Sequence, residues 1–479
     1  MRKFFERFLI LSLSAAMTLS LVSCSSKNSS AQKAKEAKDV KIVEDEALEG
    51  TRTQADWIDT AVIYEVNVRQ YTEEGTFDAF SQHLQRLKDM GVNTLWFMPI
   101  YPIAEANRKG TLGSYYSIAD YTSVNSEFGT IEDFKELVDT AHDMGFHIIL
   151  DWVANHTGWD HTWITEHPEY YLHDEAGNII SPLNTDWYDV AQLDYTNEDM
   201  QTAMIEAMSY WVKDIGVDGF RCDYAQGVPT AFWEKARTEL DKIKPVYMLA
   251  EDGTCSETFL MNAFDSDYNF NLYSALKFSA KTPNTADDIL KHITEDLPYG
   301  SFRMNFIDNH DQNYYSDTLE NRFTKEALGA LYTVVFTGYG VPLIYSGNEE
   351  SADTFVEFFE KDNIGFGDYE YEDLLTDLCH IKTENEPLYN GIYGGKVREI
   401  EDDNKSVIAY ERVKNGKQIT VVVNFNSEES KVNYEQEFTD GNVLLHGDGG
   451  GVISNEPTKL NKDDLNTLKP FEYYIILSE

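Results

Sequence analysis

The chain has 479 residues, enough for one large domain and a second, smaller one. It contains 39 Lys and Arg against 83 Asp and Glu, a formal net charge of -44. This charge strongly disfavours nucleic acid and anionic membrane surfaces as partners, and a soluble, well-solvated surface accounts for it. The 42% of hydrophobic residues can build a substantial core.

Residues 1–24 are predicted to be an export signal. A basic start precedes an apolar run over 8–22, which is too short and too rich in Ser and Thr for a membrane span. The run ends in Leu-Val-Ser-Cys, with the cysteine at Cys24, and resembles the lipobox of bacterial lipoproteins. An ordinary cleaved signal with a chance cysteine is the alternative. The resemblance implies an exported protein held at the cell envelope or cell surface by a lipid on Cys24, with 25–50 as a flexible tether.

Between residues 51 and 389, short apolar runs alternate with helical patterns. One helix is indicated by Thr130 as a cap and Gly145 as a stop, with apolar residues at helical spacing between them. Eight runs read as strands: 61–68, 94–99, 146–151, the run that Val217 leads into and that ends at Asp223, 246–250, 263–265, 302–307 and 342–345. Alternating strands and helices predict an α/β fold, a (β/α)8 TIM barrel.

Two segments depart from the barrel pattern. Residues 157–193 are too many for a plain loop and predict a small subdomain inserted after the third strand. Over 390–479 the runs 397–400, 406–410, 418–424, 441–445 and 471–476 predict short strands and no obvious helix. The chain should therefore end in an all-β sandwich domain.

The remaining cysteines are Cys222, Cys255 and Cys379. Their number and spacing fit neither a zinc site nor a disulfide framework. Cys222 lies in a predicted buried strand, where a small apolar filler is the expected role.

Polar clusters follow four of the predicted strands. They read Asp-Trp-Val-Ala-Asn-His over 151–156, Arg-Cys-Asp over 221–223, Glu-Asp over 251–252 and Asp-Asn-His-Asp over 308–311. In a barrel these strand ends converge on one face, where active sites are built. Any one of them could be a surface turn, but four that place acids beside His or Arg indicate an active site.

Within the second cluster, Arg221 and Asp223 point to the same side because strand side chains alternate. An arginine beside a carboxylate favours its ionised form, which a carboxylate nucleophile needs. A structural ion pair is the alternative for this stretch taken alone.

The four clusters, as DWVANH, GFRCD, LAED and FIDNHD, resemble the four ordered motifs of glycoside hydrolase family 13, the α-amylase family. GVNTLWFMP, AQLDY and GVPLIYSGNE support the resemblance. It extends from about Trp57 to the chain end and is nearest to bacterial secreted or lipid-anchored α-amylases and neopullulanase-like enzymes.

The resemblance implies a role for each matching residue. Asp223 would be the nucleophile, Glu251 the general acid/base and Asp311 the transition-state stabiliser, which suits an oxocarbenium-like transition state. The residues that would hold the sugar in the −1 subsite are His156, Arg221, His310 and Tyr116. For Tyr116 a core aromatic is the alternative, because Tyr115 stands beside it.

The implied function is retaining hydrolysis of α-1,4-glucosidic bonds in α-glucans such as starch or maltodextrin. A transglycosylase, a neopullulanase-type enzyme and a non-catalytic glucan-binding protein are the alternatives. The C-terminal domain could be a starch-binding module, but its aromatic residues are not evidently grouped, and a packing role is preferred.

No cofactor is expected to be required. Many family members have Lys-His where this chain has Gln226-Gly227, and that histidine often gives its carbonyl to a structural calcium. Asn155 matches a calcium-ligand position, although a supporting role beside the catalytic residues is equally plausible. The departure puts the calcium site in doubt, and no metal ligand set is assigned.

Overall fold

The computed structural model describes residues 53–254, 256–294 and 297–478. The export signal, Cys24, the whole tether and Cys255 lie outside the described residues. Within them, no helix combines the length and the apolar character needed to cross a membrane.

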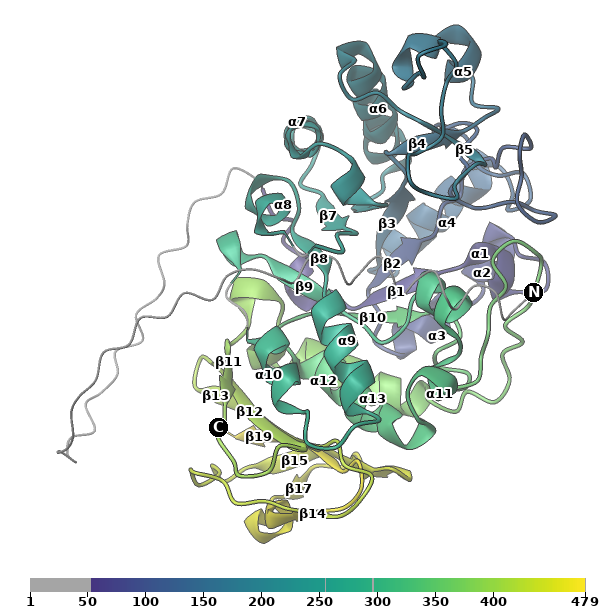
Figure 1. Cartoon of the computed structure of the whole chain (residues 1–479). Coiled ribbons are helices and arrows are strands. Elements are labelled where there is room, and N and C mark those ends of the chain that lie inside the picture. Colours follow the sequence, from purple (N-terminus) through teal and green to yellow (C-terminus); the bar gives the residue numbers. More distant parts are fainter. Residues whose placement is uncertain (1–52, 255, 295–296, 479) are drawn as a thin grey trace, which may run out of the picture. The chain divides into compact units, whose positions relative to one another are not determined.

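Eight parallel strands close into a barrel in the spatial order β1-β10-β9-β8-β7-β6-β3-β2 (Figure 1). The strands are β1 (Ile63–Val66), β2 (Thr94–Phe97), β3 (His147–Trp152), β6 (Gly219–Cys222), β7 (Tyr247–Ala250), β8 (Ser266–Tyr268), β9 (Phe302–Asn305) and β10 (Gly340–Tyr345). The apolar runs form these strands because both of their faces are buried. The predicted TIM barrel is confirmed.

The prediction of a strand over 263–265 is wrong. Ala263 and Phe264 end the preceding helical segment, and β8 begins at Ser266. β8 carries Ser266 and Asp267, both fully buried polar residues, so it has no continuous apolar run. Hydrophobic pattern alone therefore placed the strand three residues too early.

α-Helices follow most of the strands and lie around the outside of the barrel, and one short helix, α5, belongs to the inserted segment (Figure 1). They are α1 (Val68–Tyr71), α2 (Phe77–Ser81), α3 (Leu84–Asp89), α4 (Ile131–Asp143), α5 (Trp163–Glu166), α6 (Glu198–Tyr210), α7 (Thr230–Asp241), α8 (Glu257–Asn262), α9 (Phe270–Ser279), α10 (Asp287–Ile293), α11 (Leu319–Arg322), α12 (Leu328–Thr337) and α13 (Glu372–Glu384). α4 begins as predicted: Thr130 and Asp133 form a reciprocal capping box.

Between β3 and α6 the chain leaves the barrel. β4 (His156–Gly158) and β5 (Val190–Gln192) pair antiparallel and bring the two ends of this excursion together. The pairing places His156 at the base of the inserted segment, close to the end of β3. The exact limits of the inserted subdomain and of the other domains remain predictions.

The C-terminal part is an all-β domain. A seven-stranded sheet has the order β11-β12-β13-β19-β15-β16 with β17 beside β15, and β14 pairs with β18. The bounds are β11 (Val397–Glu399), β12 (Val407–Lys414), β13 (Lys417–Asn424), β14 (Ser430–Lys431), β15 (Asn442–Asp448), β16 (Gly451–Ser454), β17 (Thr458–Lys459), β18 (Thr467–Leu468) and β19 (Tyr473–Ser478).

The two faces of this sheet pack differently, as strand alternation requires. Ile419, Val421 and Val423 of β13 belong to the core shared with the barrel, whereas Val422 belongs to a second, smaller core. α12 packs so closely on the sheet that a Cβ at Gly329 would lie 2.6 Å from the Tyr473 ring. The domain is thus built against the barrel.

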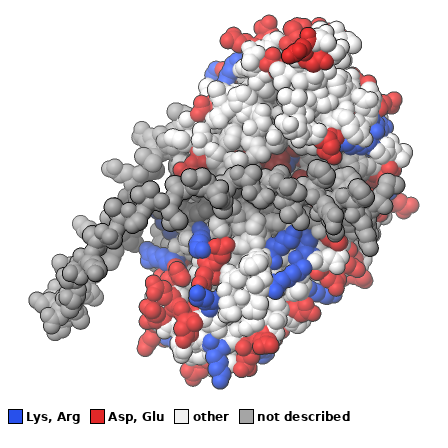
Figure 2. Space-filling view, in the orientation of Figure 1, with Lys and Arg blue, Asp and Glu red and all other residues white. Residues whose placement is uncertain are grey.

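Cys222 and Cys379 are buried free thiols, and Cys222 fills space in β6 as predicted. Asp and Glu side chains are spread over the visible face of the described residues, with Lys and Arg among them (Figure 2). Many of the acidic side chains therefore lie on the solvated surface.

Candidate active site

The acidic residues that are predicted to be catalytic come after barrel strands, so they lie at the carboxyl-terminal end of the barrel. β6 and β7 pair in parallel, with Cys222 opposite Ala250. Asp223 directly follows Cys222, and Glu251 directly follows Ala250. Neighbouring strands lie about 4.8 Å apart, so these two carboxyl groups are brought side by side. Asp311 follows β9 after a short loop.

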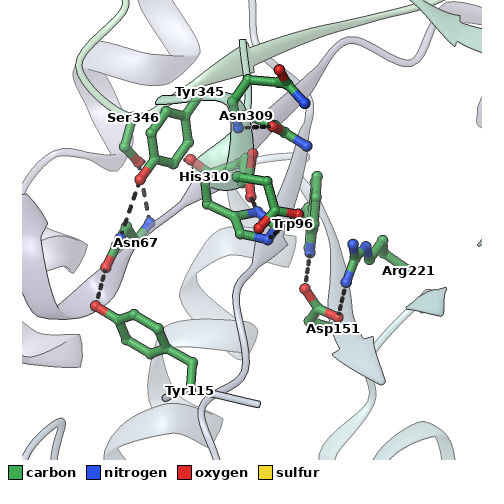
Figure 3. Close-up of polar contacts among 12 residues, drawn as sticks. Asn67, Trp96, Tyr115, Asp151, Arg221, Asn309, His310, Tyr345 and Ser346 are labelled. Carbon is green, nitrogen blue, oxygen red and sulfur yellow. Dashed lines mark hydrogen bonds and ion pairs between the residues drawn. The ribbon is translucent and has the colours of Figure 1, made fainter. Parts of the chain in front are cut away.

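Arg221 contacts three acids: Asp151, as Figure 3 shows, and also Asp223 and Glu251. Its Nη1 donates to Asp151 Oδ1 at 2.8 Å and to Asp223 Oδ1 at 3.0 Å. Its Nη2 lies 2.9 Å from Glu251 Oε2, an ion-pair contact without hydrogen-bond alignment. Arg221 and Asp151 are both completely buried, so this guanidinium is the fixed centre of the cluster.

Aromatic groups fix the arginine and the aspartate. Tyr268 Oη accepts a hydrogen bond from Arg221 Nε at 3.0 Å. Trp96 Nε1 donates to Asp151 Oδ2 at 3.3 Å, and Tyr116 Oη donates to the same oxygen at 3.0 Å. The indole ring of Trp96 also faces the Arg221 guanidinium at 5.2 Å.

Tyr116, His310 and Asp311 form the opposite side of the cluster. Tyr116 Oη is 2.8 Å from His310 Nε2, and the two rings stack with centroids 5.4 Å apart. His310 Nε2 is also 3.3 Å from Asp311 Oδ2. Tyr116 packs against the hydrophobic core, and its hydroxyl reaches Asp151 and His310. Its role as the stacking residue of the −1 subsite stays a prediction.

His156 is buried and lies at the edge of this group. Its Nδ1 is 3.1 Å from Asn155 Nδ2, and the Trp187 ring stands 5.5 Å from the imidazole. Burial lowers the pKa of His156 to about 4, so the imidazole is neutral near neutral pH. A neutral imidazole can donate or accept one hydrogen bond to a sugar hydroxyl.

Burial governs the acids as well. It raises the pKa of Asp223 well above its ordinary value; Arg221 opposes this, and the Glu251 and Asp151 carboxylates add to it. For Asp311, burial acts in the same direction, but His310 lowers the pKa below its ordinary value. The expectation that Arg221 keeps Asp223 ionised thus describes only one of several opposing effects.

Four residues that the sequence did not single out belong to the site: Glu65, Trp96, Tyr268 and Phe358. Phe358 stacks on Tyr116 at 6.1 Å and on His310 at 6.3 Å. Glu65 accepts from His310 Nδ1 at 2.5 Å. A charged residue inside the apolar run 61–68 was the only signal for Glu65, and the other three look like ordinary core aromatics.

The residues at the expected calcium position do not fit that ion. Asn155 Oδ1 accepts from Gln192 Nε2 at 3.1 Å, and Asn155 Nδ2 donates to Gln192 Oε1 at 3.3 Å, so the two amides pair with each other. A Cβ at Gly227 would lie 2.8 Å from Asn155 Oδ1. Calcium favours several carboxylate oxygens, and the described residues hold no group of three or more His, Cys, Asp or Glu that could bind a metal ion.

A cavity of about 710 Å³ lies elsewhere, between the 280–283 segment and the C-terminal sheet, with Phe425 and Phe471 among its lining residues. None of the catalytic candidates lines it. The acidic cluster, not this cavity, carries the chemistry considered below.

Comparison with known proteins places the chain in a family. The family model described as the catalytic domain of α-amylase matches residues 50–188 and 181–364, and the C-terminal domain of maltogenic amylase matches 397–475. An α-amylase from Haloarcula japonica is 26% identical over 431 residues, covering 86% of this chain. The chain spans 62% of that relative's length.

Two solved structures are similar over nearly their whole length. An α-amylase from Lactobacillus plantarum is 30% identical with a TM-score of 0.76, covering 88% of this chain and 99% of the other. A maltogenic α-amylase from Thermotoga neapolitana is 29% identical with the same TM-score and the same coverage. The chain therefore belongs to the α-amylase family of glycoside hydrolases, glycoside hydrolase family 13.

Proposed function

We propose that this protein is a retaining hydrolase of α-1,4-glucosidic bonds in starch, maltodextrin or related α-glucans. The observation that carries the proposal is the shared arginine: Asp223 and Glu251, at the ends of paired strands, both contact Arg221. Retaining glycosidases hold their two carboxyl groups about 5–5.5 Å apart, too close for a water between nucleophile and sugar. Carboxyl groups bridged by one guanidinium suit this spacing.

Asp223 is the proposed nucleophile. Arg221 binds its Oδ1, and among the described residues no hydrogen bond reaches its Oδ2. Oδ2 can then attack the anomeric carbon and form a glycosyl–enzyme ester while the bond to the leaving oxygen breaks.

Glu251 is the proposed acid and base. The backbone N–H of Tyr224 donates to its Oε2 at 2.8 Å, and Arg221 lies beside the same oxygen. Oε1 is the oxygen left to carry a proton. It would give this proton to the leaving oxygen and later take one from the water that hydrolyses the ester, so that two inversions retain the α configuration.

The remaining residues are proposed to bind the sugar that is attacked. Asp311, with its lowered pKa, would supply negative charge beside the oxocarbenium-like transition state. Tyr116 would stack on the ring, Arg221 and His310 would donate to its hydroxyl groups, and the neutral His156 would donate or accept.

Replacing Asp223 by Asn removes the attacking oxygen, and Glu251→Gln removes the proton donor. Each variant should lose most of the activity, more than about 10³-fold in kcat, and should keep its melting temperature and glucan binding. Glu257→Gln, an exposed acid in the first turn of α8, is the matched control and should be fully active.

Proton NMR of the first products on maltoheptaose tests the stereochemistry. An α-anomer should appear first. A β-anomer, or near-normal turnover by the Asp223→Asn variant, would refute the assignment. Chromatography of products from starch, pullulan and maltoheptaose separates a hydrolase from a transglycosylase or a neopullulanase-type enzyme.

We also propose that the protein is exported and anchored by a lipid on Cys24. The support is the lipobox-like end of the apolar run and the polar stretch that follows it. Detergent-phase partitioning tests this: the wild-type protein should enter the detergent phase and the Cys24→Ala variant should stay in the aqueous phase. Equal aqueous partitioning of both would overturn the proposal.

A further inference from the structure

Glu65 is a carboxylic acid in the middle of the barrel wall. It lies in β1 with no exposed surface, between Tyr64 and Val66, which are also fully buried. Burying a carboxylate is unfavourable unless it is paired. Its Oε1 is paired with His310 Nδ1 at 2.5 Å, and its Oε2 has no hydrogen-bond partner among the described residues.

The other side of His310 faces the catalytic cluster. Its Nε2 lies 2.8 Å from Tyr116 Oη and 3.3 Å from Asp311 Oδ2. Tyr116 donates its own proton to Asp151, so its oxygen accepts from His310. An imidazole that donates from both nitrogens, to Glu65 on one side and to Tyr116 and Asp311 on the other, is protonated on both.

We propose that Glu65 is a positioning residue of this active site, which holds His310 as an imidazolium whose Nε2–H points at Asp311 and Tyr116. Glu65 does not touch the reacting atoms and acts only through His310. The inference deepens the proposed hydrolase function and rests on it for its kinetic consequences.

The surroundings of His310 account for its charge. Glu65 of β1, Asp311 and Tyr116 Oη face its nitrogens, the rings of Trp96 and Phe358 pack against it, and the Arg221–Asp151 pair lies beyond Tyr116. Burial alone would lower the pKa of His310, but the Asp311 and Glu65 carboxylates raise it well above its ordinary value. Glu65 is one of the two groups that keep this histidine charged.

Glu65→Gln removes the charge and keeps the shape. The amide oxygen of the new side chain would still accept from Nδ1–H, but with one carboxylate fewer the pKa of His310 falls. Once the imidazole is neutral, Nε2 carries a lone pair and Asp311 loses its donor. Because a raised histidine pKa keeps the charged form present up to that pKa, the alkaline limb of activity should move to lower pH in the variant.

The matched control is Glu349→Gln. Glu349 is also completely buried, follows β10 and accepts from Tyr64 Oη at 2.6 Å and from Arg86 at 2.8 Å. It has no contact with His310 among the described residues. Both variants should lower the melting temperature, but only Glu65→Gln should change the titration of the active site.

The kinetic test is the pH profile of kcat/KM on maltoheptaose for the wild type and both variants. Glu65→Gln should shift the alkaline limb down by about 1–3 pH units, the effect of one close carboxylate. An unchanged limb, or an equal shift in Glu349→Gln, would overturn the proposal, because a merely structural role would alter stability and not the profile.

The second readout is ¹⁵N NMR of histidine-labelled wild-type protein, with His310 assigned from a His310→Gln sample. Doubly protonated His310 at neutral pH is expected, and a neutral imidazole there would refute the proposal even if Glu65→Gln fails to fold. Absence of glucan hydrolysis by the wild type would refute the proposed function and leave this titration as the test of the Glu65–His310 pair.

Discussion

Gln70 connects α1, which follows the first strand of the barrel, to the last loop before α13, and its removal should loosen one wall of the active site. Gln70 lies in α1 and is completely buried. Its Nε2 donates to the carbonyls of Glu357 and Glu360 at 2.8 and 2.7 Å, and its Oε1 accepts from the N–H of Asp362 at 2.7 Å. These contacts fix the loop that carries Phe358, which stacks on Tyr116 and His310.

The Gln70→Ala variant loses three hydrogen bonds and leaves three backbone groups of the loop without partners. Each buried hydrogen bond contributes about 1 kcal/mol net, and an unsatisfied buried group costs about 1–3 kcal/mol. Water can enter and relieve part of this, so we expect the observed conformation of the loop to lose about 2–4 kcal/mol of stability. Because Phe358 is held against Tyr116 and His310 in this conformation, kcat/KM should drop by up to the same free energy, about 30-fold to 10³-fold.

The assay is kcat/KM on maltoheptaose together with hydrogen exchange of the 355–364 amides. Gln82→Ala is the control, because Gln82 is the exposed residue directly after α2 and, among the described residues, its amide donates to no side chain or carbonyl besides Ser81 Oγ and Asp78 O. The control should match the wild type in both measurements. A Gln70→Ala variant with wild-type kcat/KM and unchanged exchange in the loop would refute the reasoning.

Two further predictions concern pH and calcium. In the C-terminal sheet, burial would raise the pKa of Glu472, but His446 and the Lys469 N–H lower it below its ordinary value. The ionised Glu472 therefore stabilises the folded protein above the pKa that this group has in the unfolded chain. This stabilisation is lost as the pH falls through the pKa in the folded protein. The Glu472→Gln variant should therefore be less stable than the wild type by about 1–3 kcal/mol at neutral pH. Thermal melts should show this difference shrinking below about pH 4. A difference of the same size at neutral pH and below about pH 4 would contradict the prediction. Chelator should change the melting temperature little, because Asn155 is paired with Gln192, and a large drop would reveal a tight site.

The sequence predicts the barrel well because its strands are continuous apolar runs separated by helical patterns. It fails at β8, where Ser266 and Asp267 interrupt the apolar pattern, and at the two-residue strands β14, β17 and β18, which are too short to show any period. Such short strands exist only because neighbouring strands provide partners, and those partners cannot be read from local pattern.

The residues of the site also fall into two groups, those that the sequence identifies and those that it does not. Asp223, Glu251 and Asp311 are visible in the sequence because each stands at the end of an apolar run. Glu65 and Gln70 are not, because their partners lie 245 residues away at His310 and 287–292 residues away in the loop. Only the closure of β1 against β10 brings these segments together.

The assembled site holds more acids than cations. Glu65, Asp151, Asp223, Glu251 and Asp311 face only two cations, Arg221 and His310, among the described residues. Five ionised carboxylates cannot be held in a buried place against two positive charges, so some of them retain protons, as the raised pKa values of Asp151 and Asp223 indicate. In such a coupled group the proton belongs to the cluster and not to one residue. A double displacement needs one acid and one anionic nucleophile at once, and a cluster that shares protons around a fixed arginine supplies both without a change of structure.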